Sequence, residues 1–249
     1  MKKHPFRISF LLLLGLWMAS CRVVHVADVQ VTDFRIGEST PADSALLALI
    51  QPYQERVEKE MNVVIGKATA AMTKAQPEGT LGNWMADLVY RQGLQYDGGS
   101  IACALLNSGG IRMPGLSAGN ITKGTVFELM PFDNQLVVVT LSGEVMMQLA
   151  DRIAEKGGWP LSEGLSLTIL DGRATEVQIQ GQPLDMNGSY RVLLPDYVAN
   201  GGDDCPFLIG QPQKQLGVFV RDAIIEAVLQ DTRAGKDQEP GTLGRISKP

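Results

Sequence analysis

Histidine is almost absent from this 249-residue sequence, which holds only His4 and His25. A two-metal hydrolytic centre needs several His and Asp ligands around ions about 3.5–4 Å apart, so this chain cannot build one from histidine. The sequence also lacks the Gly-x-Ser-x-Gly turn of serine hydrolases and a Gly-rich phosphate loop ending in Gly-Lys-Ser/Thr. These absences argue against an enzyme that works alone, although paired acids such as Asp203 and Asp204 are possible acid–base groups or a simple turn.

Basic residues are scarce relative to acidic ones. The formal net charge is −5, and the sequence beyond the first twenty residues contains 19 Lys and Arg residues and 27 Asp and Glu residues. A surface this acidic repels phosphate backbones, so nucleic acid is not an expected partner. Hydrophobic residues make up 45% of the chain, which is enough for a sizeable core.

No apolar run is long enough to span a membrane. Residues 8–19 follow three basic residues and end just before Cys21. A dozen residues fall short of the ~30 Å of hydrocarbon that a helix must cross. The pattern resembles a bacterial lipoprotein signal, in which the cysteine becomes the lipidated first residue, although Met18 replaces the usual Leu. Ordinary secretion and an uncleaved anchor are the alternatives.

We therefore expect a lipoprotein-type signal peptide at 1–20, an anchor and spacer at 21–39, and one domain at 40–249. The lipid at Cys21 would hold the protein in the bacterial cell envelope, in the periplasm or at the outer membrane. Only Cys103 and Cys205 then remain. They could form a disulfide in an oxidising compartment, or they could be two small buried apolar groups.

Hydrophobic periodicity predicts helices and strands in no strict alternation. Helices are expected from Thr40-Pro41 with an apolar stripe to Val64, near Leu81, after Ser142, and from Leu216 through Phe219 to Val228. Strands are expected at 101–106, 135–141, 165–170, 175–180 and 189–195, with a further short strand around Val24 and Val26. This mixture predicts an α+β (mixed α/β) fold: a single domain with a mixed β-sheet flanked by helices.

The segment Leu106-Asn-Ser-Gly-Gly-Ile-Arg112 directly follows a predicted buried strand. Paired glycines let the backbone approach a ligand or adopt positive φ. Because the segment follows the end of a strand, Asn107 and Arg112 are expected at the opening of a pocket and not in the core. There the guanidinium could hold a phosphate or carboxylate through two hydrogen bonds. The alternative is a tight turn whose arginine is only solvated.

Two later segments combine an aromatic residue with turn-forming neighbours. In Met130-Pro-Phe-Asp-Asn134, Phe132 could offer its ring face to a base, or it could fold inward as a loop residue. In Pro195-Asp-Tyr-Val-Ala-Asn-Gly-Gly-Asp203, the reversal at the glycines could bring Tyr197 and Asp203 to one site. The alternative for this second segment is a glycine turn with a capping aspartate.

In this order, the segments resemble the C-terminal domain of the 5'-nucleotidase and UDP-sugar hydrolase family. The similarity covers roughly residues 45–246, and five motifs in register are far more specific than any one of them. They are Leu81-Gly-Asn-Trp-Met-Ala-Asp87 preceded by Glu78, Asn107-Ser-Gly-Gly-Ile-Arg112, Gly119-Asn-Ile-Thr-Lys-Gly124 followed by Pro131, Phe132 and Asn134, Tyr190 through Asp203, and Gly244-Arg-Ile246.

The resemblance implies a substrate-binding role for the residues at matching positions. Phe132 and Tyr197, which stands where the family often has Phe, would sandwich a base; stacking contributes about 1–3 kcal/mol per base. Asp203 would accept hydrogen bonds from ribose hydroxyls, and Arg112 would meet the phosphate. The remaining expected contacts are Asn107 and Asn134, which would hold base or sugar edges, and Gly109, Gly110 and Gly164, which would admit the ligand against the backbone.

Two departures from the family qualify these expectations. The family commonly places further arginines before Glu78, where this sequence has only Lys74, so phosphate would bind weakly or the ligand would be a nucleoside. The family's front domain, with two metal ions and a catalytic His–Asp pair, has no counterpart here.

These departures predict the nucleotide- or nucleoside-recognition subunit of a 5'-nucleotidase-type phosphohydrolase in nucleotide catabolism. Two divalent metals are expected on a separate metallophosphatase chain, and none on this one, which would be inactive alone. One alternative is a surface nucleoside- or nucleotide-binding lipoprotein without a hydrolase role. Another is a structural lipoprotein whose site has decayed.

Overall fold

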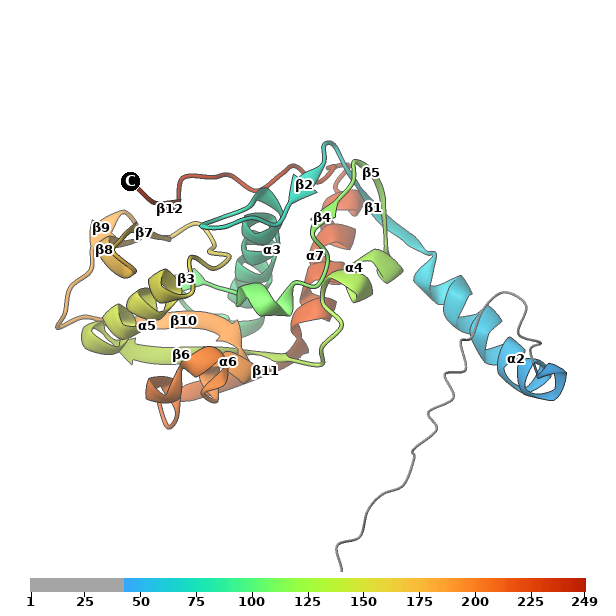
Figure 1. Ribbon diagram of the computed structural model, residues 1–249, viewed down its shortest axis with the longest axis horizontal. Coiled ribbons are helices and arrows are strands. Elements are labelled where there is room, and N and C mark those ends of the chain that lie inside the picture. Colours follow the sequence, from blue (N-terminus) through green and yellow to red (C-terminus); the bar gives the residue numbers. More distant parts are fainter. Residues whose placement is uncertain (1–42) are drawn as a thin grey trace, which may run out of the picture. The chain divides into compact units, whose positions relative to one another are not determined.

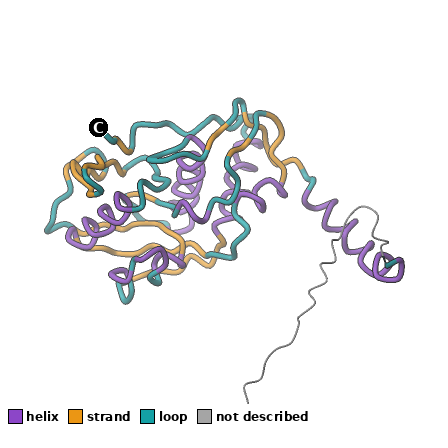
Figure 2. Tube along the Cα trace, in the orientation of Figure 1, coloured by secondary structure: helices purple, strands orange, loops and turns teal. Residues whose placement is uncertain are grey.

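The computed structural model describes residues 43–249, and Figures 1 and 2 show how their helices and strands are arranged. The expected signal peptide (1–20), the spacer (21–39) with its short strand, and lipidation at Cys21 fall outside the described residues and stay predictions. Within the described part of the chain, no helix combines the length and the apolar character needed to cross a membrane.

The central sheet is built around the valine-rich segment that was predicted as a strand. This segment forms β6 (Gln135–Ser142), and its residues 136–139 are all buried. The strand order is β11-β6-β10-β3; β6 is antiparallel to both neighbours, and β10 is parallel to β3. The other strands are β11 (Gln213–Phe219), β10 (Ser189–Pro195) and β3 (Cys103–Ala104). Burial on both sides of β6 means that each face of the sheet is covered.

Helices surround this sheet (Figure 1): α3 (Thr80–Asp97), α4 (Lys123–Leu129), α5 (Gly143–Glu155), α6 (Asp196–Ala199) and α7 (Val220–Arg233). Val138 and Leu193 belong to one hydrophobic core together with α3 and α7. Val137 and Val139 belong to a second core together with α5. Neighbouring valines serve different cores because side chains alternate across a strand. The predicted mixed α/β domain with helices flanking a mixed sheet is confirmed.

A second four-stranded sheet contributes to the α5 core. Its order is β12-β7-β8-β9, formed by β12 (Ile246–Ser247), β7 (Leu165–Leu170), β8 (Arg173–Ile179) and β9 (Gln182–Pro183). Asp171-Gly172 and Gln180-Gly181 join its hairpins, and all four residues have positive φ. Positive φ at both central residues is the pattern of a type I′ turn, which matches the twist of the strands it connects.

Two small sheets were not predicted. They pair β1 (Val64–Ala68) with β5 (Gly119–Thr122), and β2 (Met72–Thr73) with β4 (Gly115–Leu116). Strands of two to five residues are too short to show a clear alternation in the sequence. Val64, which was expected to continue a helical stripe, therefore begins a strand instead.

The first described helix, α2 (Ser44–Met61), begins later than expected. Asp43 Oδ1 accepts hydrogen bonds from the backbone N–H groups of Ala45, at 2.9 Å, and Leu46, at 3.1 Å. A side-chain acceptor that bonds two of the first free N–H groups defines the helix start. Asp43 therefore caps the described helix, whereas Thr40 and Pro41, the predicted start, lie outside the described residues.

The last predicted helix is also too long at its start. α7 begins only at Val220, whereas Leu216 and Phe219 lie in β11. Gly217 has φ +70, and the pairing of β11 with β6 shifts register between Gln215 and Phe219. A left-handed residue cannot sit inside a right-handed helix, so the apolar spacing there matched a helical period by coincidence.

The strand predicted at 101–106 is shorter than expected, because β3 covers only its middle and Leu105 bridges to Leu161. Cys103 and Cys205 are both buried and not bonded to each other. Burial raises the pKa of the Cys103 thiol to about 12 and that of Cys205 to about 11. Both cysteines therefore act as small core groups.

A buried carboxylate ties α3 to the central sheet. Asp97 accepts two hydrogen bonds from Arg191, at 2.7 and 2.8 Å, and one from Lys214 at 2.9 Å. Its side chain is 1% exposed. The hydrogen bonds from Arg191, and then those from Lys214, hold the pKa of Asp97 well below its usual range.

Replacement of this carboxylate is expected to destabilise the fold in a pH-dependent way. Asp97→Asn should lower the free energy of unfolding by about 2 kcal/mol at pH 7, because Arg191 and Lys214 lose their charged acceptor. The loss is not larger because both cations are themselves partly exposed to solvent. Since the folded pKa is depressed, the stabilisation is present above about pH 4 and fades as the pH falls further. Urea unfolding between pH 3 and pH 7 measures it, with Asp171→Asn in an exposed turn as control. A difference that does not shrink at pH 3 would contradict this account.

Candidate functional site

Three loops meet at one edge of the central sheet because of the strand directions. Leu193 in β10 pairs with Ala104 in β3 in parallel, so these strands end at the same edge. Pro195, the last residue of β10, pairs with Leu136 near the start of antiparallel β6. The loops after β3, before β6 and after β10 therefore converge, although they are up to about ninety residues apart in sequence.

These loops enclose a cavity of about 330 Å³, which lies within the range of roughly 300–1,000 Å³ for small-molecule sites. Its lining consists of Asn107, Gly109, Gly110, Arg112, Phe132, Asn134, Tyr197 and Asp203. The structure thus brings together eight of the nine residues that were singled out as substrate contacts.

Gly164 does not line this cavity. It lies in the loop before β7 and has φ +98. A Cβ atom there would come within 2.5 Å of the Gln180 amide nitrogen and 2.7 Å of the Ala102 carbonyl oxygen. Backbone conformation and packing therefore account for the glycine, and Gly164 is the one expected contact that the structure places away from this cavity.

The two aromatic rings of the cavity are exposed. Phe132 is 39% and Tyr197 is 46% accessible to solvent, which is unusual for large apolar side chains that serve only a core. The two rings come from separate loops and border the same cavity. They could bind a flat apolar group between or beside them.

Ion pairing and backbone hydrogen bonds fix the loop that carries Phe132. Arg221 at the start of α7 bonds the neighbouring Asp133 at 2.9 Å, and its guanidinium lies 4.2 Å from the ring centroid of Phe127. The Asn134 carbonyl accepts a hydrogen bond from the Val220 N–H at 2.9 Å. The phenyl ring is thus presented by a loop anchored to two elements.

Asp203 is held in a conformation that few residues adopt. It has φ +50 and follows Gly201, whose φ is +95. Non-glycine residues with positive φ are strained and often mark functional sites. The Asn107 amide, only 5% exposed, donates to Asp203 Oδ2 at 2.6 Å, and the Asp203 N–H donates to the Tyr197 hydroxyl at 3.3 Å. These bonds orient one carboxylate oxygen and join the three residues.

The next residue secures the same turn. Asp204 also has positive φ and forms an ion pair with Lys156 at 2.6 Å. The hydrogen bond from Lys156 lowers the pKa of Asp204 and raises that of Lys156 itself. Both side chains are substantially exposed, so the pair contributes to the position of the turn more than to overall stability.

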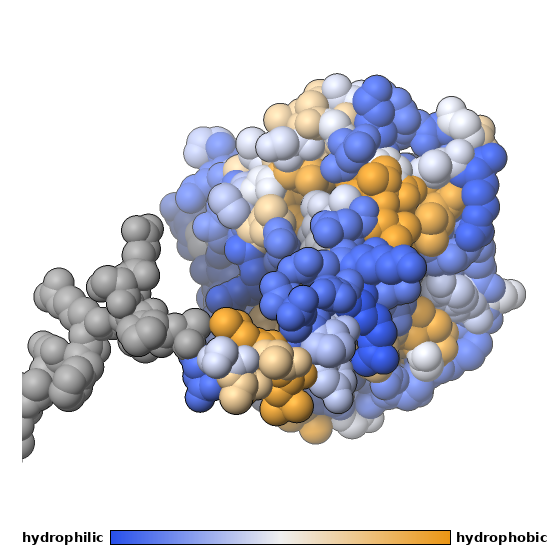
Figure 3. Space-filling model, turned by 90° about the vertical axis from the view of Figure 1, so that its right-hand side faces the viewer, coloured by the Kyte–Doolittle hydropathy of each residue, from blue (hydrophilic) through white to orange (hydrophobic). Residues whose placement is uncertain are grey.

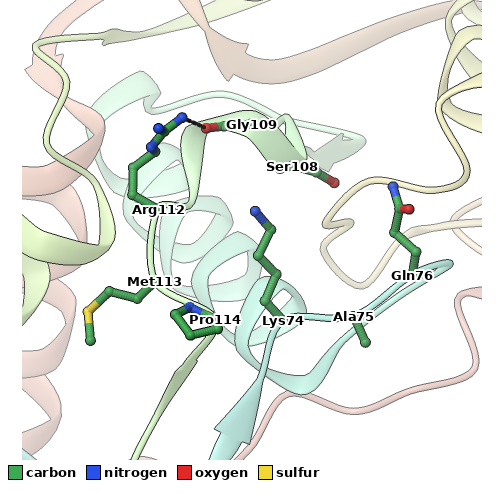
Figure 4. Close-up of a pocket in the computed structure, with 8 residues that line it drawn as sticks. All are labelled: Lys74, Ala75, Gln76, Ser108, Gly109, Arg112, Met113 and Pro114. Carbon is green, nitrogen blue, oxygen red and sulfur yellow. Dashed lines mark hydrogen bonds between the residues drawn. The ribbon is translucent and has the colours of Figure 1, made fainter.

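A larger cavity of about 530 Å³ adjoins the first, and the two share Gly109 and Arg112. Figure 4 shows the Lys74 side chain pointing toward the turn at Ser108 and Gly109, and the Arg112 guanidinium beside Gly109, to whose carbonyl it donates at 3.5 Å. The Lys74 ammonium donates to the Ile111 carbonyl at 2.8 Å, and the Arg112 guanidinium lies 5.8 Å from the Phe132 ring centroid. Arg112 therefore lines both cavities, and Lys74 adds a second cation to the larger one.

Comparison with known proteins agrees with this architecture. Residues 64–209 match the family described as "5'-nucleotidase, C-terminal domain". The chain belongs to this family. The 5'-nucleotidase of Vibrio cholerae is 29% identical over 198 residues, which are 76% of this chain and 34% of the relative. The Escherichia coli protein UshA is 24% identical over 190 residues, with 74% and 34% covered.

A solved structure supports the same assignment. The 5'-nucleotidase precursor from Thermus thermophilus superimposes with a TM-score of 0.68 at 28% identity, over 82% of this chain and 42% of the other. The 5'-nucleotidase C-terminal domain described here thus spans about a third of the length of its curated relatives. The remainder of those relatives has no counterpart in the match.

The residues of this 5'-nucleotidase C-terminal domain do not fit a two-metal centre. Within residues 43–249, no three His, Cys, Asp or Glu side chains converge as metal ligands. The only two histidines lie before residue 43. The donor set that such a centre requires is thus not assembled in this part of the chain.

Sequence reasoning missed the residues that position the site. Arg221, Lys156 and Asp196 do not line the aromatic cavity; Asp196 Oδ1 accepts from the N–H groups of Gln135, at 3.0 Å, and Tyr197, at 2.8 Å. Arg221 is 88 residues from the aspartate that it bonds, and Lys156 is 48 residues from its partner. Spacing in one sequence carries no signal for such pairs, whereas Asp196 could have been noticed as an acidic residue in the first turn of a short helix.

Proposed function

We propose that this domain recognises the nucleoside part of a nucleotide for a 5'-nucleotidase-type hydrolase whose two-metal catalytic domain lies on a separate chain. The observation that carries the proposal is the convergence of Phe132, Tyr197 and Asp203 on one cavity. Two exposed rings and an oriented carboxylate suit a base joined to a ribose.

Each lining group then has a chemical role. The base stacks against Phe132 and Tyr197, and the ribose hydroxyls donate to Asp203. The Asn107 amide donates to one oxygen of that carboxylate at 2.6 Å and the Tyr197 hydroxyl to the other at 3.4 Å, which orients both oxygens and leaves each with a further lone pair for the ligand. The 5' end of the sugar points toward Arg112 and the larger cavity, where a phosphate is accessible to a second protein. Binding that orients the phosphate lowers the barrier to its hydrolysis without any catalytic group on this chain.

Phosphate contributes little to affinity in this proposal. Arg112 is the one guanidinium that lines either cavity, and Lys74 already donates to a carbonyl oxygen. Asp203 brings a negative charge to the same site. The binding free energies of adenosine and AMP should therefore differ by less than about 1.4 kcal/mol, a factor of ten.

This weak cationic character favours a second candidate function. A nucleoside- or nucleotide-binding lipoprotein that captures its ligand at the cell surface would need the rings and Asp203, but no phosphatase partner. A neighbouring gene that encodes a metallophosphatase with its own export signal discriminates in favour of the first function. In both cases the protein is exported and anchored in the cell envelope through Cys21.

Titration of the purified protein tests the function directly. We expect adenosine, AMP and UDP-glucose to bind with micromolar Kd in calorimetric titration, because stacking on two rings contributes about 1–3 kcal/mol per ring contact. In parallel, the same protein should release no phosphate from AMP in the presence of Zn²⁺ or Mn²⁺.

The two readouts fail in different ways. Absence of binding by all three ligands would exclude nucleoside recognition and leave a structural role. Binding accompanied by steady phosphate release would show that this chain is an enzyme by itself, and the separate catalytic chain would then be abandoned.

A further inference from the structure

Helix α2 presents an apolar face that the rest of the described chain does not cover. Ile50, Tyr53 and Val57 follow one another at steps of three and four residues, so they lie on one side of the helix. Their exposed fractions lie between 42% and 61%, and no residue of α2 is buried. By contrast, α3, α5 and α7 each bury at least five residues.

An uncovered helix of this kind needs a partner. Most helical stability in proteins comes from tertiary packing of an amphipathic face, and an apolar stripe normally packs on another surface. The C-terminal end of α2 is attached to the domain: Glu60 pairs with Lys123 at 3.2 Å, and the Lys123 N–H donates to the Val63 carbonyl at 3.0 Å. Apolar patches separated by hydrophilic surface are visible on the side of the molecule drawn in Figure 3.

The position of α2 in the chain indicates what covers it. The family domain begins at residue 64, directly after the helix, and the curated relatives are about three times as long as the matched part. α2 thus lies where a relative's chain passes from its other part into this domain. We propose that the Ile50–Tyr53–Val57 face docks the separate metallophosphatase chain. This inference rests on the proposed function, since it names the surface through which the two chains assemble.

Two other occupants fit less well. A membrane surface favours basic helices, whereas Glu55, Glu58 and Glu60 outnumber Arg56 and Lys59 on α2. A second copy of this chain would pair through a coiled coil, which requires three or four heptads. The apolar stripe of α2 spans fewer than two heptads. The next position of its spacing after Val57 is Glu60, which is charged.

A charge placed within this face tests the inference. The tagged full-length chain is co-expressed with the exported metallophosphatase-domain protein encoded nearest to it in the same genome. Wild-type protein should co-purify that protein together with AMP hydrolysis, and Val57→Glu should lose both. Gln51→Glu adds the same charge on the other side of α2 and should retain both. Because position 57 is solvent-exposed, thermal unfolding of both variants should match the wild type.

Several outcomes would overturn the docking face. These are no co-purification by the wild type, unchanged co-purification by Val57→Glu, or a homodimer that Val57→Glu dissociates. A Cys21→Ser chain that co-sediments with phosphatidylglycerol vesicles only while Val57 is intact would assign the face to a membrane. Adenosine titration of the same preparations separates the two ideas: lost adenosine binding in the wild type refutes the proposed function, whereas retained binding with an unaffected complex refutes only the docking face.

Discussion

Phe132→Ala should weaken adenosine binding by roughly ten- to a hundredfold, since one base–aromatic stack contributes about 1–3 kcal/mol. The side chain is 39% exposed and its loop is held by Arg221 through Asp133, so truncation should leave the fold intact. Calorimetric titration with adenosine and uridine measures the change. Both ligands should lose similar affinity, because every base offers a π-face to the ring.

Tyr197→Phe provides the matched control for this result. It keeps the ring and removes only the hydroxyl, which accepts a hydrogen bond from the Asp203 N–H at 3.3 Å and donates to Asp203 Oδ1 at 3.4 Å. Adenosine affinity should then stay within about threefold, since both bonds are longer than ordinary hydrogen bonds of about 2.5–3.2 Å and are correspondingly weak. If Phe132→Ala binds adenosine as tightly as the wild type, the base does not stack on this ring.

The site residues could be anticipated from the sequence because each follows or precedes a predicted strand. Asn107, Phe132 and Tyr197 were placed beside the segments that became β3, β6 and β10. Their convergence follows from strand direction: β3 and β10 end where β6 begins. Taken singly, each segment had an alternative without a ligand: a tight turn with a solvated arginine, a loop phenylalanine folded inward, or a glycine turn with a capping aspartate. Only the order of all the motifs, matched to a family, favoured a common site.

Element boundaries were less predictable where two periodicities overlap. Leu216 and Phe219 suit the stripe of a helix, yet Gly217 adopts a left-handed conformation and breaks it. Intrinsic spacing cannot reveal which φ a glycine takes, since glycine populates both signs readily. In the same way, the spacing of apolar residues did not reveal that Asp43 accepts the first N–H hydrogen bond of α2.

The electrostatic supports of the site were beyond sequence reasoning. Lys156 and Arg221 act across 48 and 88 residues, and each pairs with an aspartate adjacent to a lining residue rather than with the lining residue itself. Such contacts depend on tertiary folding alone. They matter because Asp203 and Asp204 both hold strained backbone angles, which persist only when surrounding interactions fix them. A strained turn clamped on two sides presents its carboxylate with little reorganisation on binding.

Asp203→Asn should weaken ribonucleoside binding by roughly ten- to a hundredfold, because a hydrogen bond to a charged acceptor contributes about 1.5–3 kcal/mol. Asparagine tolerates positive φ, so the turn at φ +50 is preserved. The loss should appear for adenosine and be nearly absent for 2',3'-dideoxyadenosine, which has no 2' or 3' hydroxyl to donate. Competition titration with both nucleosides measures the difference.

Asp204→Asn is the control for charge and backbone strain in the same turn. Asp204 also has positive φ, but it pairs with Lys156 and does not line the aromatic cavity. Its replacement removes one negative charge next to the site, so any general electrostatic effect on binding appears in both variants. Equal losses in the two variants, or an Asp203→Asn loss that is the same for the dideoxynucleoside, would show that Asp203 shapes the turn instead of binding the ribose. A loss confined to Asp203→Asn with adenosine identifies the carboxylate as the group that recognises the sugar.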